Sequence, residues 1–150
     1  MLFVLSLAAC GQSLSRFADD NAEEAMSRFK DVVGDEVEVV SVEWFAMELK
    51  AEEKDSDDID AMVVFYYITY EVNGSEESLL VQYVEGSDED GDHAEWDTMS
   101  TFWYGTFEEM RDGFIEFYGN DDWNEEFDNY SFRHAEGTLS SREIDRYMND

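Results

Sequence analysis

An Asn-Gly pair at positions 73 and 74 is the feature that most constrains the fold of this 150-residue chain. It lies between two β-prone runs, one from Ala61 to Val72 and one that begins at Ser75. A two-residue hairpin turn needs positive φ at both central residues, and Asn-Gly is a pair that tolerates this conformation well. The sequence therefore predicts an antiparallel hairpin in which Val72 lies opposite Ser75.

This register predicts that both faces of the hairpin are apolar, because side chains two residues apart share a face. One face would carry Val64, Tyr66, Ile68, Leu79, Val81 and Tyr83. The other would carry Val63, Phe65, Tyr67, Leu80 and Val84. A sheet of this kind has to be covered on both sides. We expect a helix on one face, and a further helix, a partner or a ligand on the other.

Two further stretches read as strands. From Glu36 to Leu49 apolar residues alternate, and the register shifts after Val39 and again after Trp44, as in one long strand bent by β-bulges. The charged segment from Lys50 to Asp60 is expected to be a loop. The segment from Thr98 to Tyr104 is β-prone but also fits helical spacing, so both interpretations stay open.

Three helices are predicted. Apolar residues three and four apart indicate an amphipathic helix from Leu14 to Val33, which Gly34 can end. Two more helices begin with a capping box, formed by Thr106 with Glu109 and by Ser140 with Glu143. The first of these two ends at Gly119 and bears on one side Phe107, Met110, Phe114, Ile115 and Phe117.

The predicted fold is a single α+β domain over residues 14–150, with an N-terminal helix, an antiparallel meander of three to four strands, and C-terminal helices. A hydrophobic fraction of 43%, with 11 Phe, 8 Tyr and 4 Trp, indicates a packed core rather than a disordered chain. This element order is similar to that of cystatin-like and nuclear-transport-factor-like folds. The likeness implies no functional residue, because neither family's motif is present.

The charge of the chain limits its partners. The formal net charge is -30, and sixteen Asp and Glu but no Lys or Arg lie between Lys54 and Arg111. Such a surface repels nucleic acid and anionic lipid, whereas it attracts metal ions and cationic peptides or proteins. Two interpretations follow: an acidic, salt-adapted or alkali-adapted secreted domain of unknown role, or a surface that recognises a cationic partner.

The N-terminal residues resemble an export signal. Residues 1–9 are uncharged, apolar and too short to span a bilayer as a helix. The sequence Leu7-Ala8-Ala9-Cys10 resembles the lipobox of bacterial lipoproteins. The resemblance implies a signal peptide over residues 1–9, lipidation of Cys10, a short tether over residues 10–13, and a location at the extracytoplasmic face of the cell membrane. The alternative is that residues 1–9 begin a buried helix or strand.

Two details qualify this resemblance. The basic residues that normally precede the apolar stretch are missing, which leaves the true start of the signal peptide open. A tether of a few residues would keep the domain close to the membrane. We therefore expect the cations of the first helix, Arg16, Arg28 and Lys30, to face the lipid.

Catalytic chemistry has few candidates. The one cysteine belongs to the lipobox, and the two histidines, His93 and His134, have no serine motif beside them. No catalytic residue is predicted. A small envelope hydrolase that uses a carboxylate pair stays an alternative, although 39 Asp and Glu offer too many pairs to choose one.

One acidic segment resembles part of a calcium loop. When Gly91 is aligned with that loop's glycine, four carboxylates fall at ligand positions: Asp88, Asp90, Asp92 and Asp97. Gly86 stands where the first ligand should be, and no helix is predicted to enter the loop. A solvated acidic turn is therefore favoured over a Ca²⁺ site.

Tryptophans offer a second kind of site. An indole ring can hold a cationic group by a cation-π contact, and nearby carboxylates strengthen the attraction. An acidic, aromatic groove formed by Trp96, Trp103 and Trp123 would bind a basic peptide, while core packing is the alternative role for these rings. The sequence thus predicts a non-enzymatic, membrane-anchored domain that binds a cationic protein or peptide and no nucleic acid.

Overall fold

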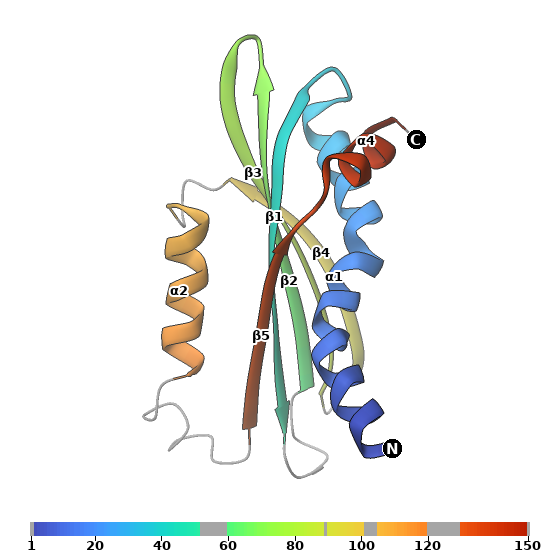
Figure 1. Ribbon diagram of the computed structural model, residues 1–150. Helices are drawn as coiled ribbons and strands as arrows, with labels where there is room; N and C mark the ends of the chain where they lie inside the picture. The colour runs from blue at the N-terminus through green and yellow to red at the C-terminus, as the bar shows by residue number, and fades with distance from the viewer. Residues whose placement is uncertain (1, 52–59, 89, 101–104, 120–129, 150) are drawn as a thin grey trace.

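The computed structural model describes residues 2–51, 60–88, 90–100, 105–119 and 130–149, with side chains from Leu14 onward except at residues 51, 88, 100 and 130. It has an α+β fold with helices on both sides of one antiparallel sheet, as Figure 1 shows. The five strands lie in the order β4-β3-β2-β1-β5. The elements are α1 (Leu2–Val33), β1 (Glu38–Ala51), β2 (Asp60–Val72), β3 (Ser75–Asp88), β4 (Gly91–Ser100), α2 (Phe107–Tyr118), β5 (Tyr130–Thr138) and α4 (Ser141–Asn149).

The β2–β3 hairpin confirms the prediction from the Asn-Gly pair. Val72 pairs with Ser75, and the two turn residues have positive φ, 53° at Asn73 and 80° at Gly74. Both predicted faces are found, because the pairing continues without a shift to Asp60. One face packs beneath α1 and the other beneath α2.

Strand β1 contains one of its two predicted bulges. Val39 pairs with Tyr70 but Ser41 with Thr69, so Val40 is the extra residue. The shift expected after Trp44 is wrong, because the pairing with β2 runs through Trp44 and the next residue without a break. Both faces of β1 are buried at this point, so consecutive apolar residues there mark a two-sided core and not a change of register.

The outer strands extend the predicted meander. The segment from Thr98 to Tyr104 could be a strand or a helix by its sequence. It belongs to β4 as far as Ser100, and residues 101–104 lie outside the described ranges. Strand β5 is an addition, because no strand was predicted after α2. It pairs with the free side of β1, placing Ala135 opposite Ala46 and Gly137 opposite Trp44.

Helix α1 packs against the sheet through small residues. Ala18, Ala22 and Ala25 are fully buried and lie on one side of the helix, so the helix backbone can approach the strands closely. The buried hydroxyl of Tyr66 donates to the carbonyl of Ala18 at 2.5 Å. Phe29 is also fully buried, whereas Val32 in the last turn of the helix is 56% exposed.

The N-terminal part of α1 was expected to be a signal peptide and a short tether. Both stay predictions; the backbone is helical from Leu2, and residues 10–13 continue into the packed helix without an extended segment. Cooperative propagation favours this, because each residue added to an existing helix gains one hydrogen bond. Within the described residues, no helix is both long enough and apolar enough to cross a membrane.

The N-cap of α2 and the reciprocal capping box of α4 are confirmed. The hydroxyl of Thr106 accepts a hydrogen bond from the Glu109 amide at 3.1 Å, and α2 ends at Gly119 as predicted. In α4 the Glu143 amide donates to the Ser140 hydroxyl, and the Glu143 carboxylate accepts from the Ser140 amide in return. One detail is wrong: Phe117, placed on the packed side of α2, is 57% exposed.

Candidate acidic cleft

A cleft of about 540 Å³ lies at the end of the sheet where β1 and β3 finish and β2 and β4 begin. Strand pairing assembles it from segments far apart in sequence, since Gly86 lies between Ala61 on one side and His93 on the other. The cleft is lined by Glu48, Leu49, Lys50, Asp60, Ala61, Met62, Glu85, Gly86, Ser87, Asp92, His93 and Ala94. The lining therefore includes four carboxylates, one lysine and one histidine.

The four carboxylates share one face of the sheet. Each is two or four residues along its strand from a side chain that packs against α1, and side chains at even spacing point the same way. The pairs are Glu48 with Ala46, Asp60 with Met62, Glu85 with Tyr83, and Asp92 with Trp96. The cleft thus continues the α1 side of the sheet beyond its apolar core.

Gly86 sets how closely the strands approach at the floor of the cleft. A Cβ atom at this position would clash with the backbone carbonyl of Asp60 and lie 3.2 Å from the Cα atom of Ala61. Backbone atoms cannot move aside as a flexible side chain can. Only glycine fits here without a shift of β2 against β3, which explains a glycine in the middle of a paired strand.

Glu48 and Glu85 accept hydrogen bonds from side chains of the protein. Glu48, whose side chain is 15% exposed, accepts from Arg133 at 2.6 Å (Nη2) and 3.0 Å (Nε). Glu85 accepts from the hydroxyl of Tyr83 at 2.9 Å. Burial, together with this bond to Glu85, raises the pKa of Tyr83, so its hydroxyl remains a donor at neutral pH. The cleft therefore combines acidic side chains held by hydrogen bonds with further carboxylates and is suited to attracting a cation.

The predicted tryptophan groove is only partly described. Trp96 lies in β4 and is half-buried, with one neighbour in the ring of Tyr83 at 4.5 Å between centroids. The guanidinium carbon of Arg28 lies 5.0 Å from the centre of the Trp96 ring, so the chain supplies its own cation there. Trp103 and Trp123 lie outside the described residues.

The calcium-loop residues lie along the β3–β4 hairpin, and the side chain of Asp88 is not among those described. Strands β3 and β4 pair as far as Asp88 and Gly91, which makes this segment a tight hairpin end. Asp92 and Asp97 are an odd number of residues apart in one unbroken strand, so their side chains point to opposite faces. Asp90 is exposed beside the turn. Among the described residues, no group of three or more His, Cys, Asp or Glu is placed to hold a metal ion.

Cys10, the predicted lipidation site, lies within the α1 backbone, and its side chain is not among those described, so lipidation stays a prediction. His93 lines the cleft and is exposed. His134 is exposed on β5 between the rings of Phe45 and Phe132, at 6.0 and 5.5 Å. Neither histidine lies beside a described serine in a catalytic arrangement.

Several cations join elements of the fold. Lys30 donates to the carbonyl of Tyr147 at 2.8 Å and so links α1 to the last turn of α4. Arg133 links β5 to Glu48 on β1. Arg28 lies over Trp96 and Lys30 binds α4, and the expectation that Arg16, Arg28 and Lys30 face lipid stays a prediction. These cations stabilise the interior arrangement and leave the acidic surface largely uncompensated.

The cleft was not predicted from the sequence because its lining residues come from four strands. Asp60 and Glu85 were visible only as two of many acidic residues, and His93 as an unpaired histidine. The register fixed by the turn at Asn73 does place Asp60 beside Ser87, which is the one signal that was available. Comparison of the chain with protein-family models, with curated proteins and with solved structures gave no match.

Proposed function

We propose that this protein is a lipid-anchored, extracytoplasmic binding domain that captures a cationic peptide or protein segment in its acidic cleft. The observation that carries the proposal is the cleft lining, in which four carboxylates accompany one lysine and one histidine. A net charge of -30 adds long-range attraction for a cationic partner, and electrostatic attraction of this kind raises association rates and selects the sign of the partner.

The proposed location rests on the lipobox-like sequence that ends at Cys10. The N-terminal end of α1 lies at the same end of the molecule as the cleft, where β1 finishes and β2 begins (Figure 1). A lipid on Cys10 would therefore hold the cleft near the membrane. A cationic segment drawn to the anionic membrane surface would meet the cleft there.

Binding is tested with a fluorescent hexalysine peptide and two matched triple variants. The cleft variant carries Asp60→Asn, Glu85→Gln and Asp92→Asn, and it leaves the Glu48–Arg133 pair intact. We expect the cleft variant to lose about tenfold in affinity, and the affinity of the parent to fall as salt rises.

The control removes the same charge at the opposite end of the β2–β3 hairpin, through Glu71→Gln, Glu76→Gln and Glu77→Gln, all at exposed positions. The affinity of this variant for the peptide should fall by no more than about twofold. Equal losses in both variants would show that the peptide responds to net charge alone, and the cleft would then not be the site.

The anchor is tested separately in bacterial cells that process lipoproteins. Radiolabelled palmitate should enter the parent chain, and membrane fractions should hold it. Cys10→Ser should abolish both the label and the membrane association. An unlabelled parent found in the cytosol would remove the proposed location and leave the peptide-binding test unaffected.

A further inference from the structure

Helix α2 has a low intrinsic tendency to be helical. It is 12 residues long, and isolated helices of this length are marginal in water. Gly113 stands at its middle, where glycine costs about 1 kcal/mol relative to alanine in a helix. Its aromatic and β-branched residues also rank below leucine and alanine as helix formers. The helical state of α2 therefore depends on contacts with the sheet.

Those contacts are made through the tips of long side chains. Phe114 stacks on Phe65 with ring centroids 5.1 Å apart, and Tyr118 stacks on Phe132 at 5.6 Å. Only Phe107 and Met110 of the helix are buried. Among the described elements, α2 is the helix that lies on this side of the sheet, opposite α1 (Figure 1). A modest apolar area thus holds the helix in place.

Charge acts against the docking of α2. The helix carries Glu108, Glu109, Asp112 and Glu116 against the single cation Arg111. The strands beneath it carry Glu43 and Glu136. Burial raises the pKa of Glu43, and the carboxylates of Glu108 and Glu136 raise it further while Arg111 lowers it. Glu43 therefore lies near two further carboxylates and one cation.

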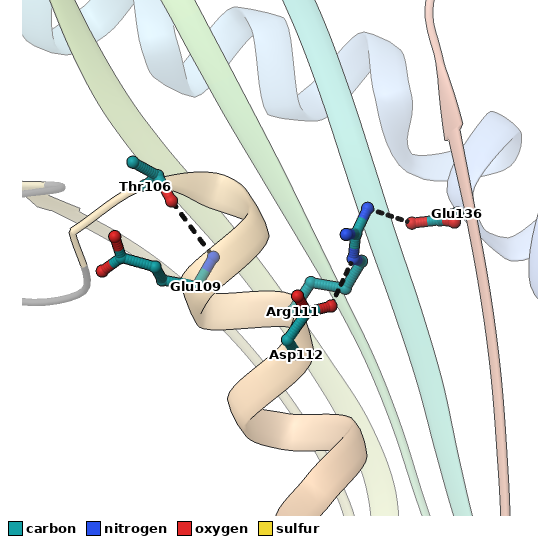
Figure 2. A network of polar contacts seen from close by, with 5 residues as sticks. All are labelled: Thr106, Glu109, Arg111, Asp112 and Glu136. Carbon is teal, nitrogen blue, oxygen red and sulfur yellow. Dashed lines mark hydrogen bonds and ion pairs between the residues drawn. The ribbon is translucent and has the colours of Figure 1, made fainter.

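Arg111 is the ionic link between α2 and the sheet within the described residues. Its Nη1 atom lies 2.8 Å from Oε2 of Glu136, and its Nε atom lies 3.0 Å from Oδ1 of Asp112, as Figure 2 shows. The Arg111 side chain is 25% exposed and that of Glu136 54%. Glycines also bound the helix, with Gly105 at φ 71° before it and Gly119 at its C-cap.

We propose that α2 is a detachable cover on the sheet, held by Arg111, whose docking strengthens as ionic strength rises. Salt screens repulsion between charges a Debye length apart, about 10 Å, much more than it weakens the direct contact between Arg111 and Glu136. In low salt the carboxylates of α2 and the sheet therefore favour release. Opening unfolds α2 and uncovers the aromatic face that includes Phe45 and Phe65, while the α1 side of the sheet stays packed.

Hydrogen exchange of backbone amides tests this in the unmodified protein. The α2 amides should exchange faster than those of β2 in about 20 mM NaCl and slow down by about fivefold or more in about 1 M NaCl. The β2 amides report global unfolding and provide the internal reference. Exchange of α2 and β2 at one shared rate, or faster α2 exchange at high salt, would overturn the proposal.

The variant Arg111→Gln tests the link itself. In low salt it should speed the exchange of the α2 amides by about fivefold over the parent. High salt should reverse most of this acceleration. An acceleration that salt does not reverse would mean that Arg111 acts by packing and not by charge. The matched control is Arg28→Gln, which removes the same charge from α1 and should leave the ratio of α2 to β2 exchange unchanged.

Discussion

The two faces of the sheet are covered by helices that pack in different ways. On one face α1 approaches through Ala18, Ala22 and Ala25, all fully buried, and its contact includes a buried hydrogen bond from Tyr66. On the other face α2 reaches the sheet through aromatic side chains and one guanidinium. A helix whose backbone lies close to the sheet, such as α1, is released only when the whole fold unfolds. A helix that contacts the sheet through long side chains, such as α2, can be released separately.

The cations of α1 and α2 also differ in the groups that they contact. Lys30 of α1 donates to a carbonyl in the last turn of α4, where a cation also meets the negative end of the helix dipole. Arg111 of α2 meets carboxylates that are themselves exposed. In a chain with only 9 Lys and Arg against 39 Asp and Glu, the position of each cation decides which element is firmly held.

The largest expected effect compares one phenylalanine from each cover. Phe29→Ala removes a fully buried ring beneath α1 and should cost about 3–5 kcal/mol of global stability in urea unfolding. Phe114→Ala removes a half-buried ring of α2 and should cost clearly less, with its main effect on α2 exchange. Equal global losses would break the comparison, because both faces would then belong to one cooperative unit.

A glycine tests how tightly the α1 face is packed. A Cβ atom at Gly137 would lie 2.5 Å from Cζ2 of Trp44, whose side chain is 5% exposed and held in the core. Gly137→Ala should therefore destabilise the protein by about 1–3 kcal/mol through overpacking. Thermal unfolding provides the measurement. A neutral or stabilising result would show that Trp44 can move and that this face is looser than described.

A glycine of α2 should behave in the opposite way. Gly113 is exposed, and a Cβ atom there would have no neighbour within 4 Å. Gly113→Ala should raise helix stability by about 0.5–1 kcal/mol and slow the exchange of α2 amides, because alanine loses less backbone entropy. Global urea midpoints should hardly change. A large rise in the global midpoint would contradict the separate opening of α2.

The smallest effects come from two carboxyl groups with raised pKa values, one near each cover. Burial raises the pKa of Asp19 on α1, with Glu143 and Asp20 adding to it, and burial likewise raises that of Glu43 under α2. A carboxyl with a higher pKa when folded destabilises the folded state at neutral pH, and that cost disappears as the pH falls through the raised value.

Asp19→Asn and Glu43→Gln should therefore each stabilise at neutral pH, by about a few tenths of a kcal/mol at such exposed positions. Each should also reduce the gain in stability on mild acidification towards the ordinary values of 3.8 and 4.5. Urea midpoints across pH test Asp19→Asn, and α2 exchange tests Glu43→Gln. A larger acid gain in either variant would contradict the direction of these shifts.

Local signals made much of the fold predictable. The turn at Asn73 and Gly74 and the two capping boxes each depend on residues within three positions of one another, so their meaning does not depend on the rest of the chain. The covered faces of the hairpin followed from register alone. The helical state of residues 2–13 differed from expectation because an apolar segment without proline suits an exported leader and a helix equally well.

Features that depend on distant pairing were not predictable. Strand β5 has charged residues at Arg133 and Glu136 and a glycine at 137, and its partner β1 lies about ninety residues earlier, so no local pattern marks it. The cleft needs four strand ends at once. The role of Arg111 required knowing which carboxylates gather beneath α2.

The position of β5 has a consequence for synthesis. β1 lies inside the finished sheet, yet one of its two edges is closed by the strand that is made last. A chain that emerges from its N-terminus keeps the hydrogen-bonding groups of that edge open until residues 130–138 appear. Products that terminate before Tyr130 should therefore expose a long, partly apolar edge that pairs readily with other chains and aggregates.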